Sequence, residues 1–260
     1  MASSPQADQL TQAHYAAQAR NAAILYLLVL RRWGLVKVDD IDESARAWLA
    51  GIVPIIFEYR RRSASLAARY YATFRALELH SLAEPAVARL AATMPLEQLR
   101  TSLLVTGPVA FKKKMRAVVA DEITIDEALK AAGRTAAAAA VRHAGDGGRQ
   151  TIIDTVTDDR LALAYARVTR AAPCYFCAML ASRGPVYPGR AFDVSDARFE
   201  GEGHAKVHDS CGCSMEPVFS ADAAWPGRGR EFEQLWKDST RGKSGAAAVK
   251  AFRHAYEQRG

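Results

Sequence analysis

Hydrophobic residues recur at helical spacing along most of the N-terminal half of the chain. Between Gln6 and Trp33 they fall on one face every three or four residues, and Gly34 follows as a stop signal. The same period runs from Glu43 to about Leu82. Pro54 lies inside this second stretch and is expected to kink or split it, because proline lacks the backbone N–H that a helix interior uses. The pattern predicts two long helices.

Shorter helices with clear start and stop signals follow. The residue before a proline is disfavoured in helical geometry. Such positions occur at Glu84-Pro85, Met94-Pro95 and Gly107-Pro108. Thr124 and Glu127 form a capping-box pattern, which opens a helix that we expect to end at Gly145. Ala136 to Ala140 lie inside this helix and are expected to form a surface on which another helix packs closely.

The composition and periodicity of the sequence change after the glycines of Gly145-Asp146-Gly147-Gly148, which we interpret as a hinge. Thr157 is expected to cap a helix that runs through Tyr165 to about Thr169. From Pro173 to Phe219 the chain is rich in Gly, Pro and aromatic residues with little periodicity, as in a small α+β module. The last stretch, Glu231 to Arg259, is again helical and mildly basic.

These patterns predict a mainly α protein in three parts. Residues 1–145 form a multi-helix N-terminal body, residues 146–225 a small α+β C-terminal module, and residues 226–260 a basic helical tail. Half of the 260 residues are apolar, so a core can be buried. The longest apolar run, Ala22 to Leu30, is far shorter than the roughly 20 residues that a membrane-spanning helix requires. We therefore expect no membrane partner.

All four cysteines lie in the module, in the pattern C-x₂-C…H-x₂-C-x-C. The N-terminus does not fit a signal peptide, so the thiols are expected to be reduced, and their clustering favours metal over disulfide. Each close pair of cysteines, called a knuckle below, supplies soft sulfur ligands at a spacing that suits tetrahedral zinc. Five candidates compete for four places. The favoured set is Cys174, Cys177, His208 and Cys211, and Cys213 in place of His208 is the second choice.

A filled four-ligand shell predicts a structural zinc, because it leaves no position for an activated water. Three alternatives compete with zinc. The two knuckles can pair as disulfides once the protein leaves the reducing cytosol, and Cys174 with Cys177 can act as a redox pair, although no βαβ context is found. A cysteine nucleophile paired with His204 or His208 is the third. No other catalytic pattern occurs, so no catalytic residue is predicted.

Two runs of cations are candidates for contact with other molecules. Arg60 to Arg62 fit a solvated helix face better than a phosphate contact. Lys112, Lys113 and Lys114 are the candidate nucleic-acid-binding residues. The formal net charge of +7 permits contact with DNA or with acidic proteins and distinguishes neither.

The cysteine-rich stretch resembles the Mu F-like minor head proteins of tailed bacteriophages, and most closely their actinobacteriophage branch. The resemblance covers roughly residues 150 to 220. It is carried by the segment from Arg167 to Tyr187, by His208-Asp209-Ser210-Cys211-Gly212-Cys213 and by Glu216-Pro217-Val218-Phe219. That family is marked by a C-x-x-C pair, a downstream hairpin and then His-x-x-Cys-x-Cys. Gly212 departs from it, since an Arg or His usually separates the last two cysteines.

The resemblance implies a structural minor capsid protein and not an enzyme. Such a protein enters the procapsid during assembly in the host cytoplasm and stays in the head interior of the virion. Its implied partners are the portal protein, the major capsid protein and the scaffolding protein, with phage DNA as a further candidate and no small-molecule substrate. A capsid maturation protease that acts on scaffold or capsid protein is the alternative, and a free-standing DNA-binding module is the second alternative.

Overall fold

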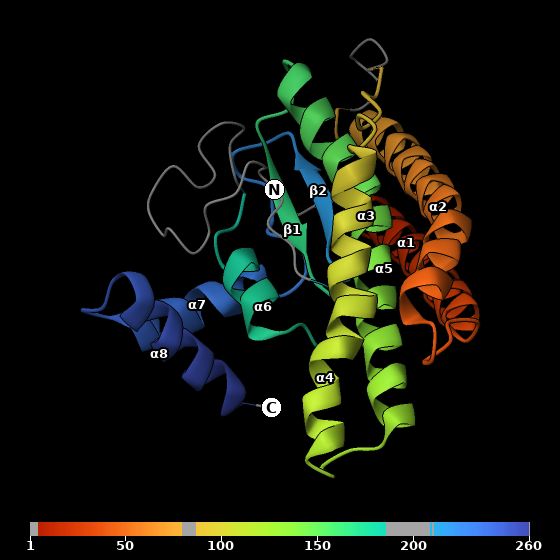
Figure 1. The fold of residues 1–260 in the computed structure, drawn as a ribbon. Helices are drawn as coiled ribbons and strands as arrows, with labels where there is room; N and C mark the ends of the chain where they lie inside the picture. The colour runs from red at the N-terminus through yellow and green to blue at the C-terminus, as the bar shows by residue number, and fades with distance from the viewer. Residues whose placement is uncertain (1–4, 80–86, 186–208, 210, 260) are drawn as a thin grey trace.

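Two long helices open the chain, as the hydrophobic period predicts. The computed structural model describes residues 5–79, 87–185, 209 and 211–259 (Figure 1). Helix α1 spans Pro5–Trp33 and α2 spans Ile41–Glu78. The expected split at Pro54 is wrong, because α2 continues through this residue. Pro54 is exposed, so water can satisfy the carbonyl group that its missing N–H leaves without a helical partner.

A second break expected at a proline is also absent. Helix α3 (Leu96–Leu104) continues through the π-helical turn η1 (Val105–Val109) into α4 (Ala110–Val119). Pro108 lies inside η1 and is buried. A π turn shifts the hydrogen bonds of the backbone by one residue, which allows the helix to pass a residue that cannot donate. The expected boundary at Pro95 is confirmed, since this residue caps α3.

Helix α5 (Ile125–Asp158) is the centre of the body and packs on both α1 and α2. The predicted capping box is confirmed, because Glu127 N donates to Thr124 Oγ1 at 3.2 Å and Thr124 N donates to Glu127 Oε2 at 2.8 Å. The predicted end at Gly145 is wrong. A Cβ at Gly147 would overlap the backbone of Arg60, and one at Gly148 would lie 2.6 Å from Gln18 Nε2. The absence of side chains at these two glycines lets α1 and α2 pack closely against α5, and α5 stays helical through both positions.

The five alanines form the packing surface that the sequence predicts. All of Ala136 to Ala140 are buried. Beside them Trp33 lies against Gly107 and Gly133, and its Nε1 donates to the carbonyl oxygen of Leu129 at 2.9 Å. The core around this tryptophan joins α1, α2, α5 and the α3–α4 helix. Its largest fully buried side chains are Leu25, Ile52, Ile56, Leu99 and Leu103.

A two-stranded antiparallel sheet lies beside the long helices (Figure 1). Strand β1 (Ala164–Val168) pairs with β2 (Ser214–Val218) so that Ala164 faces Val218 and Val168 faces Ser214. The helix that we expected through Tyr165 is therefore wrong. Asp159 ends α5, where its carboxylate accepts from Tyr71 and Arg75. All residues of β1 are buried, and its partner strand comes more than 40 residues later, beyond the reach of local periodicity.

The C-terminal helices pack on α6 (Tyr175–Ala181). The helical character expected over Glu231 to Arg259 is confirmed, and it is divided into two helices, α7 (Gly229–Thr240) and α8 (Gly245–Glu257), because Gly242 turns the chain with φ of +71°. Met179, Leu180, Phe232, Leu235 and Phe252 form the buried cluster that joins these three helices. The apolar side of the basic tail is thus covered. The division at residues 145 and 225 stays a prediction.

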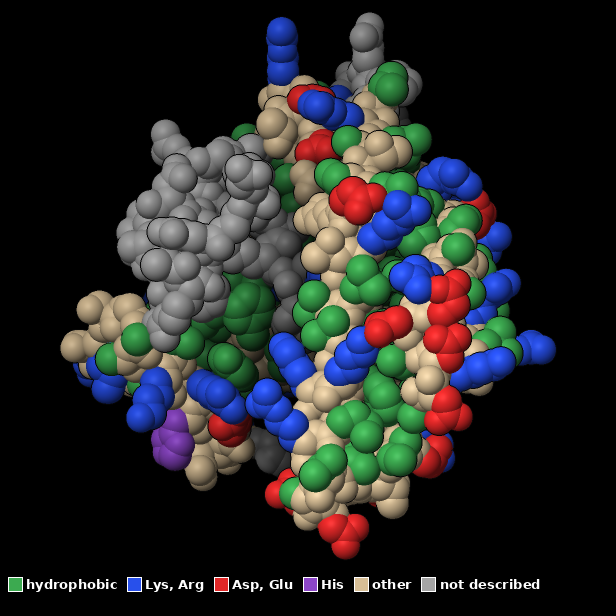
Figure 2. Space-filling view, in the orientation of Figure 1, with side chains coloured by type: hydrophobic (Ala, Val, Ile, Leu, Met, Phe, Trp, Pro, Cys, Tyr) green, Lys and Arg blue, Asp and Glu red, His purple; other side chains and the backbone are tan. Residues whose placement is uncertain are grey.

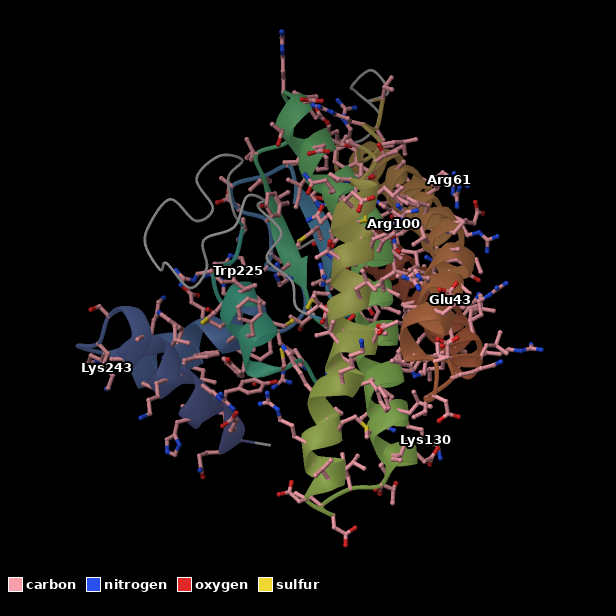
Figure 3. All side chains as sticks on the ribbon, in the orientation of Figure 1. Glu43, Arg61, Arg100, Lys130, Trp225 and Lys243 are labelled. Atoms are coloured by element: carbon pink, nitrogen blue, oxygen red, sulfur yellow. The ribbon has the colours of Figure 1, made fainter. Side chains whose placement is uncertain are left out.

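The side chains of Arg60 to Arg62 bind residues of the protein's own helices. Arg61 and Arg62 both pair with Glu58, and Arg61 projects from the outer side of α2 (Figure 3). Arg60 instead donates to the carbonyl oxygen of His143 on α5 at 2.9 Å. Two of the three arginines therefore lie on a solvated face, as predicted, and the third joins two helices.

Candidate metal centre

The fold brings the two cysteine knuckles together from distant parts of the chain. Cys174 caps the N-terminus of α6, and its Sγ accepts a hydrogen bond from Cys177 N at 3.4 Å. Cys177 lies in the first turn of that helix and is buried. Cys211 and Cys213 are buried in the segment that leads into β2. Pairing of β1 with β2 carries the second knuckle back to the first.

The spacing of the sulfur atoms fits a tetrahedral metal. The Sγ atoms of Cys177, Cys211 and Cys213 all lie within 4.8 Å of one another, and those of Cys177 and Cys211 are 3.7 Å apart. Zinc–sulfur bonds of about 2.3 Å place tetrahedral ligands about 3.8 Å apart. A disulfide needs about 2.05 Å, and all four cysteines of this structure are thiols. The donor set and its geometry therefore suit a metal ion.

The structure places four of the five predicted ligands. Cys174 packs against the other three cysteines and is only partly buried, and its Sγ is not among the three that lie within 4.8 Å of one another. His208, which the sequence favoured, and His204 lie outside the described residues. Which four candidates bind metal therefore stays a prediction. Gly212 leaves room for a side chain, because a Cβ there would meet Tyr15 and Arg170 only at ordinary contact distances.

The sulfur atoms are unequal in their tendency to ionise. Hydrogen bonds from the thiols of Cys177 and Cys213, together with the positive charge of Arg149, hold the pKa of Cys211 far below its usual range. Hydrogen bonds with the side chains of Cys174, Cys211 and Cys213 raise the pKa of Cys177. Metals bind thiolate and not thiol, so metal binding to this cluster requires its thiols to lose their protons.

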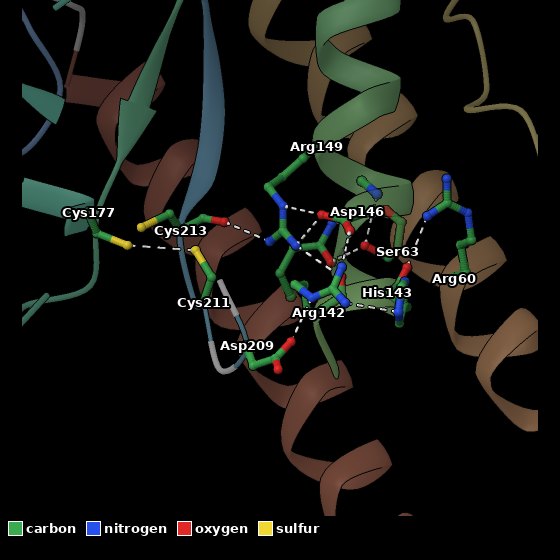
Figure 4. Close-up of polar contacts among 12 residues, drawn as sticks. Arg60, Ser63, Arg142, His143, Asp146, Arg149, Cys177, Asp209, Cys211 and Cys213 are labelled. Carbon is green, nitrogen blue, oxygen red and sulfur yellow. Dashed lines mark hydrogen bonds and ion pairs between the residues drawn. The ribbon is translucent and has the colours of Figure 1, made fainter. Parts of the chain in front are cut away.

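Arg142, Asp146 and Arg149 form a ladder of charged residues on α5 that joins this helix to the segment of Cys211 and Cys213 through hydrogen bonds (Figure 4). Arg149 Nη1 donates to the carbonyl oxygen of Cys213 at 3.1 Å, and Arg142 Nε donates to Asp209 Oδ1 at 2.7 Å. Asp146 lies between the two arginines and accepts from Arg149 Nη2 at 2.6 Å. Sequence reasoning missed this ladder, because it ended the helix at Gly145. The i, i+3 and i, i+4 spacing of these residues was the available signal.

Comparison with known protein families decides the affiliation of the chain. A model of the family described as VG15 protein matches residues 1–239. The chain belongs to the VG15 family. VG15 is a viral family of phages, which agrees with the phage origin that the cysteine motif implies. No curated protein and no solved structure matches. In this VG15 protein, no helix among the described residues is long and apolar enough to cross a membrane.

The predicted nucleic-acid-binding lysines of this VG15 chain lie on α4. Lys112 is occupied by an ion pair with Asp42, whose Oδ1 lies 2.6 Å from its Nζ. Lys113 is exposed and Lys114 is partly exposed. Figure 2 shows Lys and Arg side chains gathered where α4 faces the C-terminal helices. Nothing in the contacts themselves assigns a partner to this surface.

A buried polar cluster in the VG15 chain had no counterpart in the sequence analysis. Glu216 on β2 is 6% exposed, and its Oε2 accepts from Thr11 Oγ1 at 2.7 Å. Tyr70 lies 2.8 Å from the same Thr11 oxygen and stacks on His14 at 4.3 Å. Burial raises the pKa of Glu216 to about 7 and lowers that of His14 to about 4. This cluster joins α1, α2 and β2.

Proposed function

We propose that this chain is a structural minor capsid protein of the Mu F-like type and that it holds a zinc ion through its cysteines. Membership of a phage family over residues 1–239 supports a role in the particle. The observation that carries the proposal is the convergence of Cys177, Cys211 and Cys213 within 4.8 Å of one another. Three of the cysteines that form the Mu F-like sequence pattern therefore lie next to one another in this fold.

Cys177, Cys211 and Cys213 would hold the metal, with Cys174 as the fourth ligand and His208 as the alternative. Zinc supplies a fixed tetrahedral crosslink when it is bound and is not reduced or oxidised. A complete shell leaves no place for water on the metal, which favours a structural over a catalytic role. The protein's own part is to bury three of the thiols and to orient the second knuckle from α5.

The helical body provides the partner surfaces in this proposal. The implied partners are the portal, major capsid and scaffolding proteins, met in the host cytoplasm during assembly and retained in the head interior. Several large apolar side chains on the α3–η1–α4 helix are exposed, which is common at surfaces that other proteins cover. They are Leu96, Leu104, Val105, Val109 and Val119.

Incubation with its assembly partners tests this function against the capsid maturation protease. We expect the reduced, zinc-loaded protein to leave purified scaffolding and major capsid proteins intact, and to be detected in procapsids and heads by mass spectrometry. Intact masses of the partners measured over hours provide the readout, with partners alone as the control. Defined cleavage products would establish the protease instead. Absence of the chain from heads would remove the structural role.

Contact with packaged DNA is the part of the proposal that concerns Lys113 and Lys114. The double substitution of these lysines by Gln is expected to weaken retention of duplex DNA. It should also reduce the slope of log affinity against log salt by up to about 2, since each phosphate contact contributes about 0.9. Lys112→Gln is the matched control, because Asp42 already pairs with Lys112. Equal binding by all three proteins would exclude α4 from DNA contact.

A further inference from the structure

Arg149 is a buried cation beside the sulfur cluster. Its side chain is 5% exposed, although it lies in the middle of α5. Every hydrogen-bonding nitrogen of the guanidinium has a protein acceptor. Nη1 donates to the carbonyl oxygen of Cys213, Nη2 donates to the carbonyl oxygen of Arg142 at 3.0 Å, and both Nε and Nη2 donate to Asp146 Oδ1. The group is therefore fixed in position and orientation.

The carboxylate that pairs with this cation, Asp146, is itself only partly buried. Asp146 is a quarter exposed and is shared with Arg142, whose Nη1 lies 3.9 Å from its other carboxylate oxygen. Further negative charge close to a buried cation lowers the cost of burying it. Besides Asp146, the thiol groups of Cys211 and Cys213 also act on the charge of Arg149. These carry full negative charge when a metal binds them.

We propose that Arg149 is a positioning residue of the metal centre. It holds the Cys211–Cys213 segment against α5 and offsets the negative charge of the metal-bound thiolates. Four thiolates around Zn²⁺ leave a net charge of −2, and Arg167 on β1 supplies a second buried cation near Cys211 and Cys213. Groups that hydrogen-bond the ligands of a metal site commonly raise its affinity 10- to 100-fold. This inference rests on the proposed zinc site.

The position of Arg149 also couples the metal to the helical body. Gly148, its neighbour in α5, donates its backbone N–H to Ser63 Oγ on α2, and Ser63 in turn contacts Gln18 on α1. A rigid path of hydrogen bonds therefore runs from the carbonyl of Cys213 through α5 to both long helices. Loss of Arg149 removes the link between the second knuckle and this path.

Metal affinity of the full-length, reduced protein tests the proposal. Wild type, Arg149→Met, Arg149→Lys and Arg60→Met are stripped of metal and titrated with zinc in competition with a chelator of known affinity. The thiolate-to-metal absorption of the cobalt form reports whether sulfur ligation is retained. Arg60→Met is the matched control, because Arg60 also donates to a carbonyl of α5, that of His143, and its other hydrogen bond to a described residue goes to the carbonyl of Ala92.

We expect zinc to bind Arg149→Met 10- to 100-fold more weakly than wild type, Arg149→Lys to fall between them, and Arg60→Met to stay within twofold of wild type. An Arg149→Met protein within twofold of wild type overturns the proposal. If Arg149→Met does not fold, Arg149→Lys decides, and an affinity within twofold then overturns it. A wild-type protein that binds neither zinc nor cobalt defeats the proposed zinc site itself, which is a distinguishable result.

Discussion

Replacing Cys177 and Cys211 by serine is expected to abolish zinc binding and to unfold the segment between the two strands. These two thiols are buried, and their sulfur atoms are 3.7 Å apart at the centre of the cluster. Structural zinc can contribute on the order of 10 kcal/mol to the folding of a small module. The apolar cluster of this segment joins α6 to α7 and α8 rather than to the long helices, and polar contacts of Arg142 with Asp209 and of Arg149 with Cys213 tie its far end to α5.

Elemental analysis, limited proteolysis and circular dichroism measure this effect together. Wild type should hold about one zinc per chain and the double variant none, with new cleavage sites confined to residues 173–219 and most of the helical signal kept. Ser182→Ala is the matched control, because it removes a buried hydroxyl of the same region, which among the described residues bonds the carbonyl of Met179. Zinc retained by the double variant, or proteolysis identical to wild type, would contradict the metal centre. Two fewer titratable thiols than expected in untreated wild type would indicate a disulfide instead.

The second large effect is a loss of stability as the pH rises from about 4.5 to neutrality. Burial, the largest cause, and the charges of Asp8 and Glu78 raise the pKa of Glu216 while the hydroxyls of Thr11 and Tyr70 lower it, and the net result is a rise from 4.5 to about 7. The folded protein therefore binds this proton more tightly than the unfolded chain does. Its contribution to stability is complete below pH 4.5 and is lost between pH 4.5 and about 7. The loss amounts to about 3 kcal/mol at 1.4 kcal/mol per pKa unit.

Glu216→Gln should remove this dependence and stabilise the protein at pH 8 by up to about 3 kcal/mol, since the amide oxygen can still accept from Thr11. Urea unfolding of wild type and variant at pH 5 and pH 8 measures the change. The difference between the two proteins isolates Glu216, because both retain His14 and the cysteines. Glu231→Gln is the control for an exposed carboxylate, which pairs with Arg228 on the surface. A variant that is no more stable than wild type at pH 8 would show that Glu216 is ionised at little cost.

Local sequence signals predicted those parts of the fold that neighbours in sequence determine. The capping box at Thr124 and the apolar period of α1 depend on residues a few positions apart, and both were found. The errors lie where distant contacts decide. The sequence alone predicts a hinge at Gly147 and Gly148, whereas in the structure they are sites of close packing with α1 and α2. It likewise predicts a helix through β1, whereas hydrogen bonds with β2 make this segment a strand.

The candidate site divides in the same way. The C-x₂-C and C-x-C spacings predicted a cluster of sulfur ligands, and three of these sulfurs do converge. The spacing did not rank Cys213 beside Cys177 and Cys211, because that depends on how β2 presents its leading segment. Arg149 was invisible as part of the site, since its contact with Cys213 joins residues 64 positions apart. The Thr11–Glu216 contact was equally beyond sequence reasoning.

That last contact has a consequence for synthesis on the ribosome. Thr11 and Glu216 are separated by 205 residues, so the partner of the first turns of α1 is among the later parts of the chain to be made. Translation at 5 to 20 residues per second leaves an interval of roughly 10 to 40 s between them. During that time α1 and α2 can associate, but the face around Ala7 and Thr11 lacks its cover. The apolar residues on this face of α1 thus stay exposed to solvent until β2 is made. We expect chaperones to bind the nascent chain at this stage.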